Sequence, residues 1–98
     1  MQPNETCIDR VIRMEFYFDT ISRAVQSGMG LLLSDPLLQA MLDALIAYYE
    51  NGQWLADYEA DEQGELPSEL KRGVLSQDGV YNLLFEIEQE KQFTEEEQ

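Results

Sequence analysis

Apolar side chains recur at helical spacing along three segments of the chain. In the first segment, from about Thr6 to Ser27, they follow one another at alternating steps of four and three residues, which places them on one helix face. Asn4 or Thr6 can cap the start of this helix and Gly28 can end it. The stripe consists of Cys7, Val11, Met14, Phe18, Ile21 and Val25, widened by Ile8 and Ile12.

Two further stripes predict two further helices. Asp35-Pro36 is typical of a helix start, and Asn51-Gly52 stops the helix that follows. The last helix is expected to begin after Ser76 and to run to about Gln92. The inner face of the middle helix is predicted to be Leu38, Met41, Leu42, Leu45, Ile46 and Tyr49, and that of the last helix Val80, Leu83, Leu84 and Ile87.

The segments between these helices have weaker patterns. Residues 28–34 are apolar for a loop, so we expect them to fold back onto the core. Residues 53–63 predict a short helix, and Pro67 to Arg72 one helical turn that ends at Gly73. No stretch shows the alternation of a β-strand. The expected fold is therefore all-α, a small bundle of three to four helices with a long N-terminal helix.

The length of 98 residues predicts a single domain spanning 1–98, with about 6–92 ordered and 93–98 forming an acidic tail. Six Lys and Arg face 20 Asp and Glu, which gives a net charge of −14. This charge opposes direct binding to nucleic acid and to anionic membranes. No apolar run is long enough to span a membrane, no signal peptide is apparent, and the one cysteine suits a reducing compartment. We therefore expect a cytoplasmic protein.

Catalytic chemistry has little support in the sequence. The chain contains no His, and its one cysteine, Cys7, lies on an apolar stripe without a base that could activate it. We expect no catalytic residue, no cofactor and no enzymatic activity.

One acidic stretch resembles part of a calcium-binding loop. Asp57, Glu59 and Asp61 supply oxygens at its first, third and fifth positions. The pattern then fails, because Glu62 stands where Gly is needed and Ser68 where a bidentate Glu is needed. No defined metal site is predicted, and weak divalent-metal binding stays open as an alternative.

Aromatic and basic residues in the second half suggest binding. Tyr48, Tyr49, Trp54 and Tyr58 lie within eleven residues, a grouping found in cores and also in binding hot spots. Lys71-Arg72 is interpreted as an internal salt-bridge partner of nearby acids, with a ligand anchor as the alternative. The candidate binding residues are Trp54, Asp57, Tyr58, Glu59, Asp61, Glu62, Lys71 and Arg72.

The residues from Tyr48 onward resemble a bacterial family of small acidic proteins known only as a domain of unknown function. The resemblance covers about 8–87 and is most specific from Leu70 to Leu84, where the chain reads Leu-Lys-Arg-Gly-Val-Leu-Ser-Gln-Asp-Gly-Val-Tyr-Asn-Leu-Leu. It implies a bacterial, cytoplasmic origin and one shared structural or binding unit. In a structural version of that unit, Lys71 or Arg72 pairs with Asp57. The unit comprises Trp54, Asp57, Lys71, Arg72, Gly73 and Asp78.

The sequence favours a non-enzymatic, acidic protein-interaction domain that binds another protein, whose identity it does not give; its charge would attract a basic partner. One alternative is a nucleic-acid mimic that inhibits a basic nucleic-acid-binding protein, since an array of carboxylates can imitate phosphates. The other alternative is a weak divalent-metal-binding protein. A homodimer that pairs the seam of the first helix with its copy also stays open.

Overall fold

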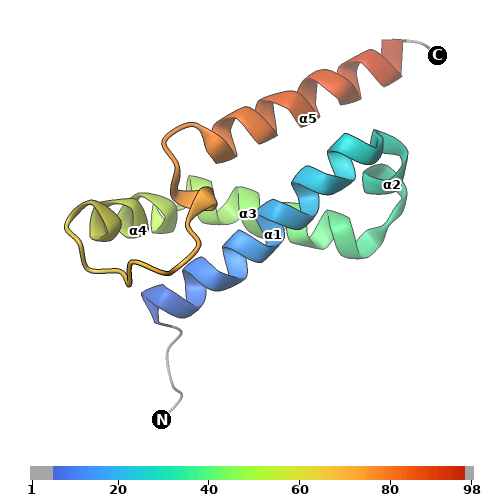
Figure 1. Ribbon diagram of the computed structural model, residues 1–98. Helices are drawn as coiled ribbons and strands as arrows, with labels where there is room; N and C mark the ends of the chain where they lie inside the picture. The colour runs from blue at the N-terminus through green and yellow to red at the C-terminus, as the bar shows by residue number, and fades with distance from the viewer. Residues whose placement is uncertain (1–5, 97–98) are drawn as a thin grey trace.

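The computed structural model describes residues 6–96, leaving aside the side chains of Met29 and of residues 92–96. It contains five α-helices and one 3-10 turn in this range and no strand, which confirms the all-α fold with a long N-terminal helix (Figure 1). These elements are α1 (Cys7–Ser27), α2 (Met29–Ser34), α3 (Pro36–Glu50), α4 (Gln53–Glu62), η1 (Gly73–Leu75) and α5 (Gly79–Glu96).

The longest helix, α1, begins and ends where its sequence predicts. The Thr6 hydroxyl accepts a hydrogen bond from the Asp9 amide at 3.0 Å, and Gly28, at φ 126°, terminates the helix. The alternative cap, Asn4, lies outside the described residues. The buried face of α1 carries Val11, Met14, Ile21, Ala24 and Val25.

Two isoleucines of α1 do not join this face. The expectation that Ile8 and Ile12 widen it is wrong, since their side chains are 38% and 53% exposed. Each follows a residue of the predicted stripe by one position, and one position turns a side chain by about 100° around the helix axis. That rotation is enough to carry both side chains out of the core.

The segment after Gly28 is helical rather than a loop. The six residues of α2 form a short helix in which the Ser34 hydroxyl donates back to the carbonyl of Gly30 at 2.8 Å. Leu32 is 1% exposed, so the segment does fold back onto the core as expected. The next helix starts at once, because the Asp35 carboxylate accepts from the Leu37 amide and Pro36 takes the first helical position.

Helix α3 lies against α1 and runs in the opposite sense (Figure 1). Its buried residues are Leu38, Leu42, Leu45 and Tyr48. The sequence pattern placed Tyr49 on this face instead, because steps of three and four residues from Leu45 are equally helical. The structure selects Tyr48, whose hydroxyl finds a buried partner on α4. Tyr49 is half-buried at the edge of the core.

A connection of 16 residues, 63–78, joins α4 to α5. Residues 67–70 form one turn, in which the Leu70 amide donates to the Pro67 carbonyl at 3.2 Å, but the predicted helical turn does not extend to Arg72. The 3-10 turn lies instead at η1, where Val74 and Leu75 are buried. Two hydrogen bonds hold η1 in place. The amide of Val74 donates to Glu15 Oε1 of α1 at 2.7 Å, and Trp54 Nε1 of α4 donates to the Val74 carbonyl at 2.8 Å. This turn therefore links the first helix to the fourth.

Helix α5 closes the core. Val80, Leu83 and Ile87 are buried and Leu84 is partly buried, as predicted. The helix runs to Glu96, beyond the predicted end near Gln92. The side chains from residue 92 and the last two residues of the predicted acidic tail lie outside the described part of the chain. Among the described residues, no helix is both long and apolar enough to cross a membrane.

Candidate functional site

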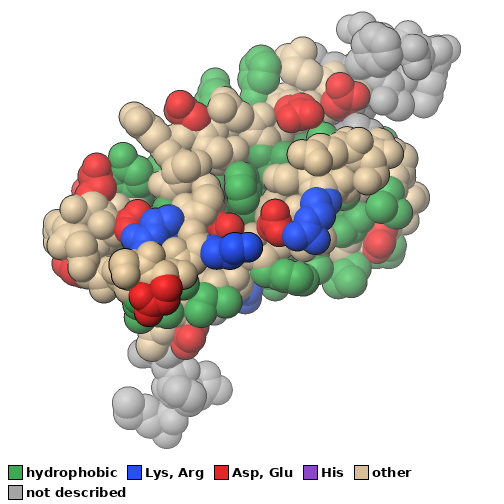
Figure 2. Space-filling model, in the orientation of Figure 1, with side chains coloured by type: hydrophobic (Ala, Val, Ile, Leu, Met, Phe, Trp, Pro, Cys, Tyr) green, Lys and Arg blue, Asp and Glu red, His purple; other side chains and the backbone are tan. Residues whose placement is uncertain are grey.

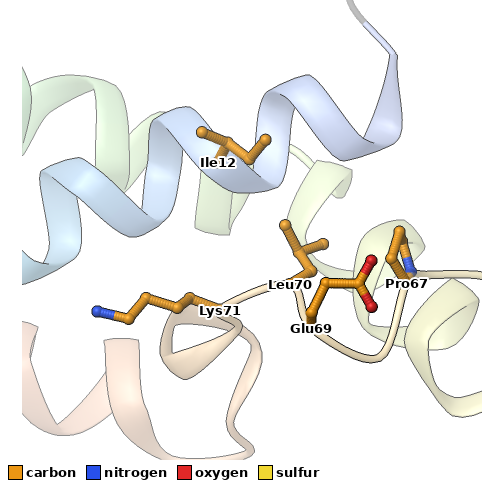
Figure 3. Close-up of a pocket in the computed structure, with 5 residues that line it drawn as sticks. All are labelled: Ile12, Pro67, Glu69, Leu70 and Lys71. Carbon is orange, nitrogen blue, oxygen red and sulfur yellow. The ribbon is translucent and has the colours of Figure 1, made fainter.

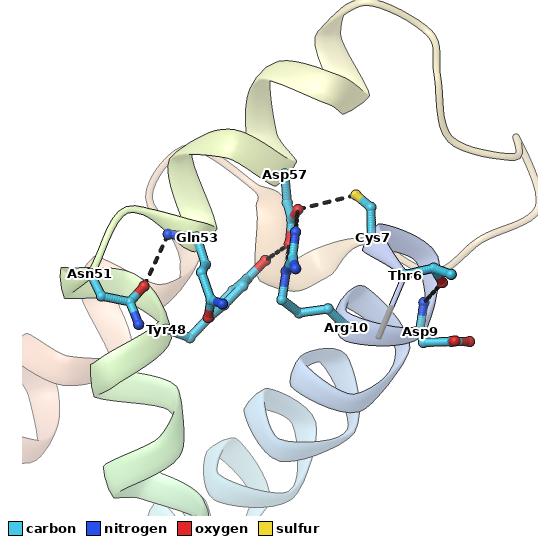
Figure 4. A network of polar contacts seen from close by, with 8 residues as sticks. All are labelled: Thr6, Cys7, Asp9, Arg10, Tyr48, Asn51, Gln53 and Asp57. Atoms are coloured by element: carbon cyan, nitrogen blue, oxygen red, sulfur yellow. Dashed lines mark hydrogen bonds and ion pairs between the residues drawn. The ribbon is translucent and has the colours of Figure 1, made fainter. Parts of the chain in front are cut away.

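The charged cluster at the junction of α1, α3 and α4 centres on one buried carboxylate. Asp57 is 1% exposed and accepts four hydrogen bonds (Figure 4). Arg10 donates through Nε to Oδ2 at 2.8 Å and through Nη2 to Oδ1 at 2.5 Å. The Tyr48 hydroxyl donates to Oδ2 at 2.8 Å and the Cys7 thiol to Oδ1 at 3.1 Å. Three helices are thus joined through one side chain.

The ionisation states in this cluster follow from these contacts. Burial by itself would raise the pKa of Asp57, but hydrogen bonds from Arg10, Cys7 and Tyr48 outweigh it and hold that pKa below its ordinary value. Burial, together with the bond to Asp57, raises the pKa of the Cys7 thiol to about 11. The same two causes raise the pKa of Tyr48. Asp57 is therefore ionised at neutral pH while its two neutral donors keep their protons.

This arrangement corrects the pairing inferred from the sequence. Arg10, and not Lys71 or Arg72, is the basic partner of Asp57. Arg72 instead pairs with Asp61 and donates to the backbone carbonyls of Pro67 and Leu70. The inferred pairing relied on nearness along the chain, whereas the packing of α1 in the fold brings Arg10 across to α4.

The remaining acidic candidates point in different directions. Glu59 and Glu62 are exposed on the surface of α4, whereas Asp57 faces inward and Asp61 is held by Arg72. A helix spreads these four carboxylates around its axis, so they cannot converge as they would in a calcium-binding loop. Among residues 6–96, no three acidic or thiol side chains come together in a way that could hold a metal ion.

The aromatic candidates form a stacked cluster at the surface. The rings of Trp54 and Tyr58 stack with centroids 5.1 Å apart, and Tyr49 meets Trp54 edge-on at 5.2 Å. One turn of helix separates Trp54 from Tyr58, which brings their rings onto the same side of α4. The bond from Trp54 to the carbonyl of Val74 fixes the orientation of the indole. The cluster is thus a rigid platform, half-buried on one side and open on the other.

Two adjoining hollows lie over this platform, with volumes of about 460 and 420 Å³. Both are bordered by Tyr49 and Tyr81, so they are neighbouring hollows between α3, α4 and α5, and we call the two together the aromatic groove. The first hollow is lined by Tyr49, Trp54, Leu55, Tyr58, Gln77, Asp78 and Tyr81, and the second by Tyr49, Glu50, Tyr81, Leu84 and Phe85.

Half of this groove was not predicted from the sequence. Tyr81 and Phe85 are 55% and 57% exposed, and their rings stack with centroids 6.4 Å apart on the outer side of α5. The signal was available, because the two aromatics stand one helical turn apart and off the predicted inner face. Leu55, 52% exposed, extends the apolar surface on α4.

The charge around the groove has one sign. Glu50 and Asp78 lie on its border, and no Lys or Arg is among the residues that line either hollow. The negative charge of nearby Glu62 raises the pKa of the exposed Tyr58 hydroxyl. Of the other candidates, Lys71 and Arg72 line neither hollow and stand on the segment that leads to η1.

Comparison with known proteins gives one family and no individual relative. No curated protein and no solved structure matches the chain. One family, described as "Domain of unknown function (DUF4298)", matches residues 12–95. The matched range contains Tyr48 and Asp57 of the buried cluster and every residue of the aromatic groove. The expected resemblance to a domain of unknown function is thereby confirmed at the level of the family, and this chain belongs to the DUF4298 family.

Proposed function

We propose that this chain is a non-enzymatic protein-interaction domain whose aromatic groove binds a basic segment of a partner protein. The observation that carries the proposal is the groove itself, where exposed aromatic rings lie next to acidic side chains and no Lys or Arg is among the lining residues. Tyr and Trp are enriched in binding hot spots, since they combine a large apolar surface with a polar tip.

The chemistry of the groove selects for a cation with an apolar stem. An Arg or Lys side chain can lay its methylene groups on Tyr81 and Leu55 and place its charge near Glu50 or Asp78. A cation over an aromatic face contributes about 0.5–1 kcal/mol at an exposed site. The net charge of −14 adds long-range attraction that accelerates encounter with a basic partner.

A catalytic or metal-binding function has less support from the contacts. Asp57 and Tyr48, whose pKa values are both shifted in the fold, are buried and hydrogen-bonded to each other, and neither lines the hollows described above. The acidic residues behind the metal hypothesis are distributed around α4. We therefore place the function at the surface.

The test is capture of partners on the immobilised chain from a lysate of its source organism. We expect at least one basic protein to bind the unaltered chain and to be released by salt. Glu50→Lys, which reverses a charge on the groove, and Tyr81→Ser, which removes an exposed ring, should abolish that capture.

Asp43→Lys is the matched control. It makes the same change in charge at an exposed position of the same helix, outside both hollows. Equal capture by the Glu50 and Asp43 variants would exclude the groove as the binding site. Competition by DNA for a captured protein would favour the nucleic-acid-mimic form of the function, in which the partner offers its nucleic-acid-binding face.

A further inference from the structure

A second apolar surface lies away from the aromatic groove, along the outer side of α1. Ile8, Ile12 and Phe16 are 38%, 53% and 59% exposed and stand four residues apart, so they form a continuous stripe on one side of the helix. This outer stripe is separate from the seam of α1 that the sequence offered for dimerisation. That seam is used inside the molecule, where Val11 and Ile21 are completely buried.

A hollow accompanies the stripe. Ile12, Pro67 and Leu70, together with Glu69 and Lys71, border a space of about 380 Å³ between α1 and the segment that precedes η1. Figure 3 shows the side chain of Leu70 pointing towards α1, whereas the side chain of Lys71 extends away from Leu70. The surface is therefore not only apolar but also recessed, and it can receive a side chain from outside.

The charge of α1 distinguishes it from the other long helices. It carries three Arg (10, 13, 23) against three acids (9, 15, 19), a net charge of zero. Helix α3 carries two acids and no base, α4 four acids and no base, and α5 five acids and one Lys. On the face shown in Figure 2, the Lys and Arg side chains gather over α1 and the 67–72 segment, close to acidic ones.

We infer that the outer stripe of α1 binds a second copy of this chain, with the two α1 helices antiparallel around a two-fold axis near Ile12. Two molecules of charge −14 repel each other over most of their surface. Contact through α1 is an arrangement that brings neutral helices together and keeps the acidic helices apart.

The stripe is self-complementary in this orientation. Ile8 and Phe16 each stand four residues, about 6 Å, from Ile12. Rotation about an axis at Ile12 therefore places Ile8 opposite Phe16 of the partner copy, and Ile12 opposite its own counterpart. The same rotation brings the hollow beside Ile12 to the partner's stripe. An interface of this kind is closed and stops at two copies.

Charged residues beside the stripe obey the same symmetry. Asp9 and Arg13 each follow a stripe residue by one position, so they lie on the same side of it. In the antiparallel pair, Asp9 of one copy comes opposite Arg13 of the other, and the contact is repeated on the other side of the axis. Arg13 lies over the ring of Tyr17, 6.0 Å from its centroid, which directs its guanidinium along the helix surface.

The first test is the mass of the chain in solution as a function of its concentration, measured by sedimentation velocity. The unaltered chain should approach twice its own mass, and Ile12→Glu should stay monomeric at every concentration. Leu55→Glu is the matched control, since Leu55 is exposed to the same degree but lies in the aromatic groove. Circular dichroism confirms that both variants keep their helices.

The second test addresses orientation. Asp9→Arg and Arg13→Asp should each weaken dimerisation about tenfold, because two equivalent ion pairs are lost together, and the double exchange should restore it. With diamide as oxidant, Ile12→Cys should cross-link to itself, and Ile8→Cys should cross-link to Phe16→Cys in a mixture of the two variants.

Several results would overturn the inference. A monomer at every concentration would do so, as would loss of the dimer in Leu55→Glu rather than in Ile12→Glu. Self-cross-linking of Ile8→Cys in preference to the mixed pair would show that the helices are parallel. A monomer at every concentration leaves the function proposed for the aromatic groove untouched, whereas loss of the dimer in Leu55→Glu would assign that groove to a second copy of this chain.

Discussion

At the scale of single residues, Asp57 is the charge on which the fold depends most. Its carboxylate receives four hydrogen bonds from three side chains and is almost completely buried. Removing one partner of a buried ion pair leaves the other charge without compensation, and this loss is much larger than the net stabilisation by the pair itself. Without the Asp57 carboxylate, Arg10 would be a largely buried positive charge with no partner in this cluster.

Asp57→Asn is therefore expected to lower the free energy of unfolding by about 3–5 kcal/mol, as measured by urea denaturation. The control is Asp19→Asn, which breaks the exposed pair between Asp19 and Arg23 on α1. An exposed pair at this spacing contributes about 0.3–0.5 kcal/mol. Equal losses in the two variants would contradict a structural role for the buried cluster.

The effect of Asp57 should also depend on pH. Its pKa is depressed in the folded chain, so the stability it contributes is complete above the unfolded pKa of about 3.9 and is lost as the pH falls through the folded value. The difference in unfolding free energy between the unaltered chain and Asp57→Asn should thus be constant near neutrality and shrink in acid. Denaturation curves at several pH values measure this difference. A difference that grows in acid would contradict a depressed pKa for Asp57.

At the scale of elements, the η1 turn within the connection between α4 and α5 is bonded to both α1 and α4. A Cβ on Gly79 would lie 2.4 Å from the Ser76 hydroxyl and 3.0 Å from the carbonyl of Gly73. These contacts explain why glycine stands at the start of α5. Gly30, inside α2, has open space where a Cβ would stand, with nothing within 4 Å, and its φ is not positive.

Alanine should therefore have opposite effects at the two glycines. Gly79→Ala should destabilise the chain, because the backbone of η1 has to shift to admit the methyl group. Gly30→Ala should stabilise it by about 0.4–1 kcal/mol, since alanine restricts the unfolded chain without a clash in the folded one. The melting temperatures of the two variants, measured side by side, test this expectation. A higher melting temperature for Gly79→Ala would show that η1 can admit the methyl group without cost.

The sequence predicted the elements better than it predicted their contacts. Capping residues and apolar spacing located α1, α3 and α5, since these signals are local. The partner of Asp57 lies 47 residues away in sequence, on a helix face that periodicity alone does not orient. For the same reason, the sequence pattern placed Tyr49 on the inner face of α3, where the structure has Tyr48. The 3-10 turn at Gly73 was misplaced because long-range bonds to Glu15 and Trp54 define it.

At the scale of the whole molecule, surface charge divides the chain into two regions. The α1 side is neutral, whereas the helices that form the aromatic groove are acidic. Only half of the groove was visible in the sequence, because its aromatics come from three helices that meet only in the folded chain. The aromatic groove and the outer stripe of α1 thus differ in charge and suit different partners.

The overall charge should make stability depend on salt. A net charge of −14 on a small fold creates self-repulsion that dissolved ions screen. Raising sodium chloride from low to moderate concentration is expected to raise the melting temperature, followed by circular dichroism. A melting temperature that falls with added salt would show that attractive surface pairs, such as Arg72 with Asp61, outweigh the repulsion.

The central claim, that the aromatic groove binds a basic segment, can be tested most directly through Trp54. It is the only tryptophan of the chain and lies in the groove, so its fluorescence reports on occupancy. Titration with a synthetic amphipathic peptide of Arg and Leu should change its emission to saturation. Glu50→Lys and Tyr81→Ser should weaken binding about tenfold, and Asp43→Lys should weaken it much less. Equal affinity for all three variants, or equal binding of a Glu and Leu peptide, would contradict the account.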